Sequence, residues 1–141
     1  MAIPTYDAVW EQGEDFVMNI LYKENDVPFD FTDHIIRMDL AQGNNNSVVF
    51  TLNSEDVEGL DGEGNPVDTA GSTDNEISLD ANGNITIVIS RALTLPGGII
   101  GDRILTNNKY AYDMFLRDPS GKQRKILVGS ITVNKSVTLW T

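Results

Sequence analysis

The segment Asn84-Ile85-Thr86-Ile87-Val88-Ile89-Ser90 is the clearest strand signal in this chain of 141 residues. Its central residues are all β-branched, which favours a pleated, half-buried strand over a helix. The pair Asn82-Gly83 directly before it is typical of a tight turn, and the short apolar stretch from Ile77 to Leu79 precedes that turn. The sequence therefore predicts a β-hairpin over residues 77–90.

Strand patterns continue on both sides of this hairpin. Apolar and polar residues alternate at period two in three further stretches, which are Phe16 to Tyr22, Ile36 to Leu40 and Tyr110 to Leu116. Turn sequences predict that residues 47–52 pair in a hairpin with the Ile36 to Leu40 stretch and that residues 125–133 pair with the Tyr110 to Leu116 stretch. A short last strand is expected over 137–140. No segment keeps a helical period over ten residues, and we expect only one short helical turn within 99–105. The pattern predicts an all-β antiparallel sandwich of about seven strands.

Composition limits what the chain can do. Its length indicates a single domain over residues 1–141, and the absence of cysteine excludes disulfides, thiolate metal sites and cysteine nucleophiles. One histidine, His34, excludes sites that need several histidines. No apolar run approaches the length of a membrane span, and the first residues lack the pattern of a signal peptide. We therefore expect neither membrane insertion nor secretion.

Charge is distributed unevenly, with a net −16 over residues 1–90 and +5 over 91–141. The overall charge of −11 opposes binding to nucleic acid or anionic lipid. Eight acids fall within 53–76, which we interpret as a long acidic loop that leaves the sandwich between two strands. The stretch Asp61-Gly62-Glu63-Gly64-Asn65 raises a calcium site as an alternative, but the glycine and glutamate positions of an EF-hand loop are not matched.

No residue pattern indicates catalysis. The 21 acidic residues offer many possible carboxylate pairs, but no spacing distinguishes one of them. His34 precedes a predicted strand and is interpreted as a structural residue. Residues 96–101 are glycine-rich but lack the lysine and hydroxyl residues of a phosphate-binding loop, so we interpret them as a flexible connection. We expect neither an enzyme nor a cofactor.

Three stretches occur in a characteristic order. They are Trp10-Glu11-Gln12-Gly13-Glu14-Asp15-Phe16, then Phe29 to Leu40, then Tyr110 to Leu116 with the following 118–121, 126–133 and 137–138. Together they resemble a family of small bacteriophage virion proteins, whereas residues 53–105 match this family only loosely. The chain departs from the family at Asp33-His34, where Gly-Tyr is usual, and at its Leu139-Trp140-Thr141 end.

The resemblance implies an immunoglobulin-like β-sandwich of the kind found in tail and baseplate components, including the N-terminal domain of upper baseplate proteins. The implied function is that of a structural virion protein that contacts other virion proteins in a multi-copy particle assembled in the host cytoplasm. The alternative is a capsid decoration (cement) protein that clamps neighbouring capsomers. A third hypothesis is that the chain is an enzyme or a sugar-binding receptor module.

Partner-binding residues are expected at the chain ends and in the acidic loop. Ile3 and Tyr6 in the N-terminal arm, and Leu139 and Trp140 near the C-terminus, are apolar groups that the predicted core does not need. Trp140 either docks on its own sandwich or anchors into a partner, since tryptophan is enriched at interface anchors. Asp61 and Glu63 are expected to steer a basic neighbour, an effect that salt weakens.

Because no metal-ligand spacing in the sequence is complete, we predict that chelators and millimolar calcium leave the melting temperature unchanged. Thermal unfolding followed by circular dichroism, with magnesium at equal ionic strength as the control, measures this. A stabilisation of more than about 1 kcal/mol by calcium alone would show instead that residues 53–76 bind the ion.

Overall fold

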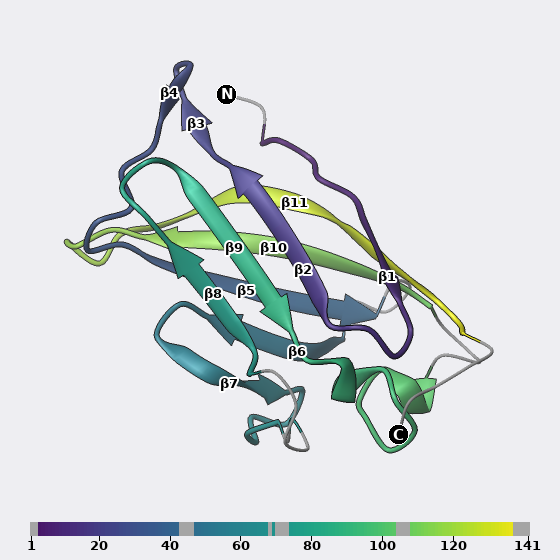
Figure 1. Ribbon diagram of the computed structural model, residues 1–141. Coiled ribbons are helices and arrows are strands. Elements are labelled where there is room, and N and C mark those ends of the chain that lie inside the picture. Colours follow the sequence, from purple (N-terminus) through teal and green to yellow (C-terminus); the bar gives the residue numbers. More distant parts are fainter. Residues whose placement is uncertain (1–2, 43–46, 68, 70–73, 104–107, 137–141) are drawn as a thin grey trace.

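The computed structural model describes residues 3–42, 47–67, 69, 74–103 and 108–136. Within them the regular structure is β, apart from two short 3-10 turns, η1 (Arg91–Leu93) and η2 (Gly101–Arg103) (Figure 1). The strands are β1 (Ala8–Glu11), β2 (Phe16–Leu21), β3 (Lys23–Glu24), β4 (Val27–Pro28), β5 (Ile35–Gln42), β6 (Val48–Asn53), β7 (Asp56–Asp61), β8 (Glu76–Leu79), β9 (Asn84–Ile89), β10 (Lys109–Arg117) and β11 (Gln123–Asn134).

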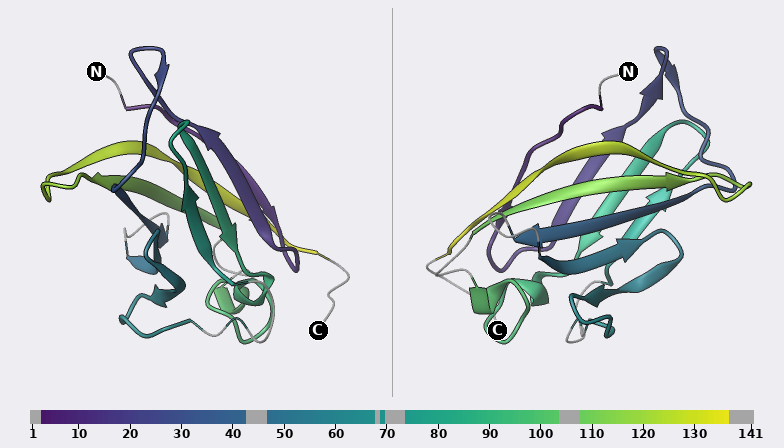
Figure 2. Two further views of the ribbon diagram at one scale, coloured as in Figure 1. Left: turned by 60° about the vertical axis from the view of Figure 1, so that its left-hand side comes forward. Right: turned by 180° about the vertical axis from the view of Figure 1, so that it is seen from behind.

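These strands form two packed sheets and one small hairpin, β3–β4, as the two views of Figure 2 show. The larger sheet has the order β1-β11-β10-β5-β6-β7, and the smaller one has the order β2-β9-β8. In immunoglobulin lettering, the strands β11, β10, β5, β6 and β7 correspond to G, F, C, C′ and C″, and β1 is added beside G. The smaller sheet, β2-β9-β8, corresponds to B-E-D, and the whole is the variable-type arrangement. The all-β, immunoglobulin-like sandwich is therefore confirmed. One pair departs from the antiparallel expectation, because β1 runs parallel to β11.

The core lies between the sheets and follows the predicted alternation. In β2, Phe16, Met18 and Ile20 are buried, while the residues between them face outward. On the facing sheet Met38 and Met114 are completely buried. Antibody domains place a tryptophan and a disulfide at the centre of this core. This chain has no cysteine, and its buried tryptophan, Trp10, lies on β1, where it packs on Phe16 at 5.3 Å between ring centroids.

Gln12 marks the corner at which the chain passes from the large sheet to the small one. Its buried side chain donates to the carbonyl of Thr94 at 2.9 Å and accepts from the amide of Ser136 at 3.1 Å. Gly13, with φ of +88°, makes the bend between the two sheets. The Gln12-Gly13 pair of the first motif is thus a structural junction that ties β1, the segment after β9 and the end of β11 together.

The N-terminal arm, residues 3–7, lies along β11 and extends the edge begun by β1. Its backbone bonds to Val128, through Tyr6 N–H to the Val128 carbonyl at 2.9 Å and Val128 N–H to the Pro4 carbonyl at 3.1 Å. The hydroxyl of Tyr112, whose ring is buried, donates to the Tyr6 carbonyl. Gly129 makes this approach possible, because a Cβ there would lie 1.8 Å from the same carbonyl oxygen.

Residues 96–101 are not the flexible connection that their composition indicates. Ile100 is completely buried in the core, and its amide donates to the Leu93 carbonyl at 2.8 Å. The amide of Gly97 donates to the Asp102 carboxylate at 2.9 Å. The segment is therefore packed and internally bonded. The expected short helical turn within 99–105 is present as η2, whereas η1 is not anticipated by the sequence.

We predict that Gly129→Ala destabilises the domain by about 2 kcal/mol, because the added methyl group overlaps the arm backbone and the Tyr112 hydroxyl. Urea unfolding measures the loss, and limited proteolysis reports release of the arm. Val128→Ala, one residue earlier and half-buried, is the matched control and should change stability by less than about 1 kcal/mol. Equal stability of Gly129→Ala and the wild type would mean that the arm does not cross β11 here.

Candidate protein-binding surfaces

The described part of the acidic stretch 53–76 includes a strand, which corrects the expectation of a long loop. Residues 56–61 form β7, which pairs antiparallel with β6 and provides the outer edge of the large sheet. Gly59 and Asn75 are buried, and the Asn75 side chain bonds to the Glu58 carbonyl and the Ser90 amide. The acidic composition did not predict this strand, because its acidic residues occupy positions at a solvated sheet edge.

Asp61 begins a turn that has two counterparts among the described residues. The Asp61 carboxylate accepts from the amides of Glu63 and Asn65, both at 2.9 Å, and Gly64 has φ of +85°. The same pattern, with aspartate first and glycine fourth, recurs at Asp80 and Asp118. One oxygen of Asp61 therefore caps the backbone of a hairpin turn. Glu63, the other predicted steering residue, is exposed in this turn.

The turns at Asp80 and Asp118 give the fold a defined acid sensitivity. Hydrogen bonds from the Asn84 side chain and backbone lower the pKa of Asp80 below its usual value of 3.8, and those from Ser120, side chain first, lower the pKa of Asp118. A lowered folded-state pKa means that these bonds stabilise the protein above about pH 4 and that the contribution is lost as pH falls through the lowered values.

We predict that Asp118→Asn is less stable than the wild type at pH 7 and that the difference disappears near pH 2, where the wild-type carboxylate is protonated. Urea unfolding at both pH values measures it. Ser120→Ala, which removes the hydroxyl that donates to Asp118 at 2.6 Å, should move the acid unfolding midpoint upward. A stability difference that is constant from pH 7 to pH 2 would contradict this role of the carboxylate.

Of the residues expected at the chain ends, only those in the arm can be placed. Ile3 and Tyr6 are exposed, at 43% and 40%, although the backbone beside them is bonded to β11. Leu139 and Trp140, and the expected last strand over 137–140, lie outside the described residues. The structure thus brings Ile3 and Tyr6 to one sheet edge, and Asp61 and Glu63 to the turn after the opposite edge strand.

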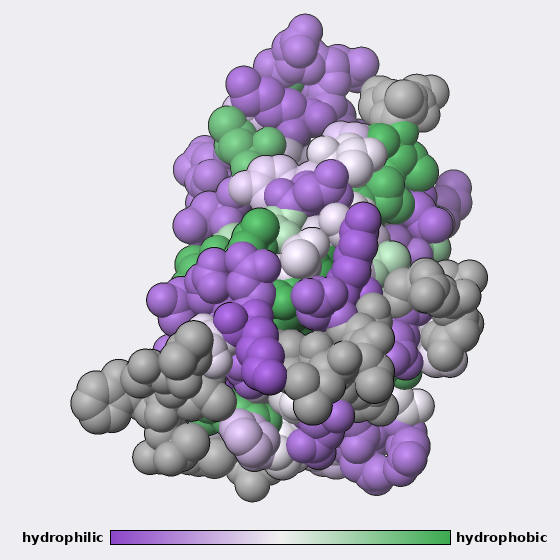
Figure 3. All heavy atoms as spheres, turned by 90° about the vertical axis from the view of Figure 1, so that its right-hand side faces the viewer, coloured by the Kyte–Doolittle hydropathy of each residue, from purple (hydrophilic) through white to green (hydrophobic). Residues whose placement is uncertain are grey.

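Exposed apolar groups gather along the β1 and β2 side of the sandwich. Six of the seven large apolar side chains that are exposed among the described residues belong to the first 27 residues, and they are Ile3, Tyr6, Val9, Val17, Leu21 and Val27. β1 is the edge of the large sheet, and β2 is the edge of the small one. Figure 3 views this side, where hydrophobic groups interrupt the hydrophilic surface. We call residues 3–27 on this side the N-terminal edge.

Sequence reasoning missed four of these residues, Val9, Val17, Leu21 and Val27. Alternation correctly divides β2 into two faces, but a sandwich strand normally has polar residues on its outer face. The detectable signal is the uncharged run Phe16-Val17-Met18-Asn19-Ile20-Leu21, in which apolar residues stand on both faces. Such a run in an acidic chain indicates a strand whose outer face is apolar and suited to contact with another protein surface.

The outer face of the large sheet is a second candidate surface. Asp39 and Asp113 lie directly opposite each other on β5 and β10, an arrangement that like charges make unfavourable. Arg37 and Lys125 compensate, at 3.0 Å from Asp39 and 3.5 Å from Asp113. Beside this charged row is a shallow hollow of about 640 Å³, lined in part by Ala41, Ala111 and Gly129. The face is polar and internally paired.

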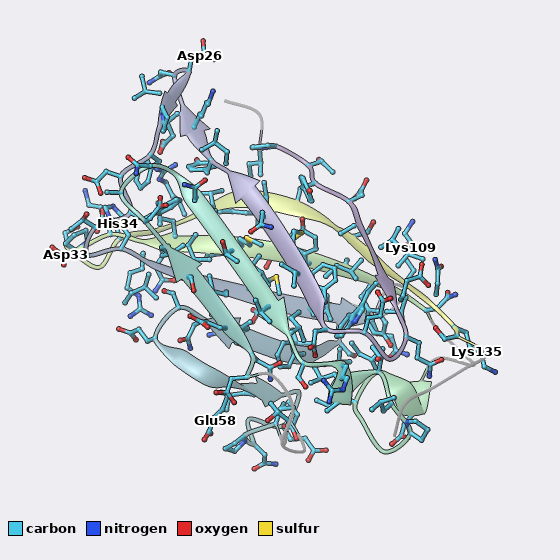
Figure 4. The ribbon with its side chains drawn as sticks, viewed as in Figure 1. Asp26, Asp33, His34, Glu58, Lys109 and Lys135 are labelled. Atoms are coloured by element: carbon cyan, nitrogen blue, oxygen red, sulfur yellow. The ribbon has the colours of Figure 1, made fainter. Side chains whose placement is uncertain are left out.

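The two charge halves of the sequence do not form two poles in space. Acidic β1 pairs with β11, and β5 pairs with β10, so the halves interleave within one sheet. Figure 4 shows Glu58 on β7, far from Lys109 and Lys135 at one end of β10 and β11. Other cations, including Arg117 and Arg124, lie at the opposite end of these strands. The acidic edge at β7 is therefore a local feature of the surface.

The described part of the chain holds no group of three or more side chains that could bind a metal ion, and no helix in it is long and apolar enough to cross a membrane. His34 donates through Nδ1 to the Thr32 carbonyl at 2.8 Å and packs edge-on against Phe29. This arrangement agrees with the structural interpretation of the histidine.

No protein family and no curated protein matches the chain. Solved structures that it resembles include murine CRIg, at 16% identity and a TM-score of 0.41 over 93% of this chain and 92% of that one. Another is the extracellular domain of the voltage-gated sodium channel β4 subunit, at 10% identity, a TM-score of 0.41 and 97% coverage of both chains. The SrpA adhesin of Streptococcus sanguinis gives 13% identity and a TM-score of 0.40, over 96% of this chain and 56% of that one. Similarities this weak give no information about function.

Proposed function

We propose that this chain is a structural virion protein of a bacteriophage, a tail or baseplate component that works through contacts with other virion proteins. The observation that carries the proposal is the N-terminal edge, where exposed apolar groups from the arm, β1 and β2 collect on one side of the sandwich. Several exposed apolar groups along one side of an otherwise charged protein suit a surface that becomes covered in an assembly.

The motifs that resemble phage virion proteins support the proposal through the roles of their residues. Gln12 joins three segments at the corner of the sandwich, and Asp30 accepts from the amide and hydroxyl of Thr32 in the second motif. Tyr112 in the third motif fixes the arm to β11. These residues build the scaffold and position the N-terminal edge, while the virion role itself is what the sequence resemblance implies.

The chemistry of the described residues favours binding over catalysis. The buried polar side chains Gln12 and Asn75 are both occupied by backbone partners of the fold. The carboxylate of Asp61 caps a turn, and those of Asp39 and Asp113 pair with neighbouring cations. A rigid sandwich with its polar groups engaged in the fold suits a protein that presents surfaces to neighbours.

We expect the chain to be found in purified particles of the phage that encodes it, in a few to tens of copies, as a tail position requires. Quantitative gel densitometry with mass spectrometry measures the copy number. Hundreds of copies would instead identify a capsid decoration protein, and absence from particles would refute the virion role.

A surface test follows from the N-terminal edge. Val9→Ser, which changes an exposed residue of that edge, should reduce incorporation at least several-fold, whereas Val48→Ser, which changes the exposed valine of β6, should not. Both side chains are exposed, so circular dichroism and melting should be unchanged. Equal incorporation of the two variants would show that the edge at Val9 is not the assembly surface.

A further inference from the structure

β2 is an open edge of the small sheet that lacks the usual protection against strand pairing. It pairs with β9 on one side, and no strand among the described residues is bridged to its other side. Natural edge strands are commonly short, charged, bulged or interrupted by proline. β2 has six residues with no charge and no proline, and its register with β9 is regular from Phe16 to Leu21.

The other described edges do carry such protection. β7 contains Asp56, Glu58 and Asp61, and its Gly59 has φ of +73°, which interrupts regular pairing. β8 and β1 have four residues each, and each includes a glutamate. Only β2 leaves a long neutral edge, with Val17 and Leu21 exposed at 56% and 53% on its outer face.

The sequence of β2 is self-complementary about its centre. In antiparallel pairing with a second copy about a two-fold axis at Asn19, Asn19 faces Asn19 of the other copy and Val17 faces Leu21 on both sides of the axis. On the inner face Met18 is placed opposite Ile20. Apolar cross-strand pairs of this kind stabilise sheets, and the central amides can bond to each other.

Charged residues flank the strand on both sides. Glu14 and Asp15 precede β2, and Lys23 follows it. Antiparallel pairing about Asn19 places Lys23 of one copy opposite Asp15 of the other, twice in the dimer. Asp15 is partly exposed, and within its own copy one oxygen accepts from the Arg91 amide at 2.8 Å while the other lies 3.6 Å from the Arg91 guanidinium, so Lys23 would share this carboxylate with Arg91. The same register places Glu14 opposite Glu24 of the other copy, and Glu24 is paired with Arg124 of its own copy. The interface is therefore neutral at its centre, and each end holds one opposite-charge pair and one like-charge pair.

We propose that two copies of this chain pair antiparallel through β2 and form one continuous sheet, β8-β9-β2-β2′-β9′-β8′. Main-chain hydrogen bonds supply the attraction, and the alternating side chains fix the register. Six residues on each copy make a small interface, so the isolated dimer is weak, with a dissociation constant on the order of 100 µM. The inference does not rest on a virion role, and either proposal can fail without the other.

The absence of cysteine allows a direct test of the register. Oxidised Asn19→Cys protein should form a covalent dimer, because the two side chains meet at the axis. Ser78→Cys, on the outer face of β8 at the opposite edge of the same sheet, is the matched control and should remain monomeric. A monomeric Asn19→Cys protein, or equal cross-linking of both variants, would overturn the proposal.

The facing pairs can be tested by introducing charges at Val17 and Leu21 and measuring dimerisation by sedimentation equilibrium. Protein concentrations up to about 1 mM lie above the expected dissociation constant. Val17→Glu and Leu21→Lys should each weaken dimerisation at least tenfold, and the double variant should restore it, because the two new charges face each other across the axis. Within one copy the two positions are about 13 Å apart, too far to pair. Unchanged circular dichroism confirms folding. Wild-type protein that is monomeric throughout, or a double variant no better than the single ones, would refute the pairing.

Discussion

The buried amide of Gln12 is the constraint on which the arrangement of this sandwich depends. A chain that crosses from one sheet to another at a buried corner must pair the polar groups it carries there. Gln12 does so with the segment after β9 and with the end of β11, while its own backbone bonds to Asn134 and Ser136. The crossing directs β1 along β11 and sends β2 to the free edge of the small sheet. Both open edges of the N-terminal side follow from this junction.

That junction explains why an immunoglobulin-like core can exist here without its usual central disulfide. Cross-linking in antibody domains joins the two sheets through their middle strands. In this chain the sheets are joined at the corner, by hydrogen bonds to Gln12 and by Trp10, whose indole N–H donates to the Glu14 carbonyl at 2.7 Å. The middle strands then need only apolar packing, which Met38, Met114 and the isoleucines of β9 supply. A reducing compartment does not weaken such a design.

Local patterns in the sequence predicted the parts of the fold that depend on local physics. Alternation located β2, β5 and β10, and the Asp118 turn fixed the last hairpin, because burial and turn geometry act over a few residues. β7 was missed because its acids describe a solvated edge, and the parallel pairing of β1 depends on a partner more than 120 residues away. The candidate surface was anticipated at Ile3 and Tyr6 but not at Val17 and Leu21, since the exposure of an apolar strand face depends on which strand lies at a sheet edge.

The pairing of the first strand with the last has a consequence for synthesis on the ribosome. Ala8 lies in register with Ile131, so the large sheet cannot be completed until residue 131 has emerged from the ribosome. The small sheet has all its strands by Ile89 and can form earlier. The two sheets thus become complete at different times during synthesis, and the arm and β1 have no docking strand until β11 has emerged. Any co-translational binding partner meets these residues before β11 does.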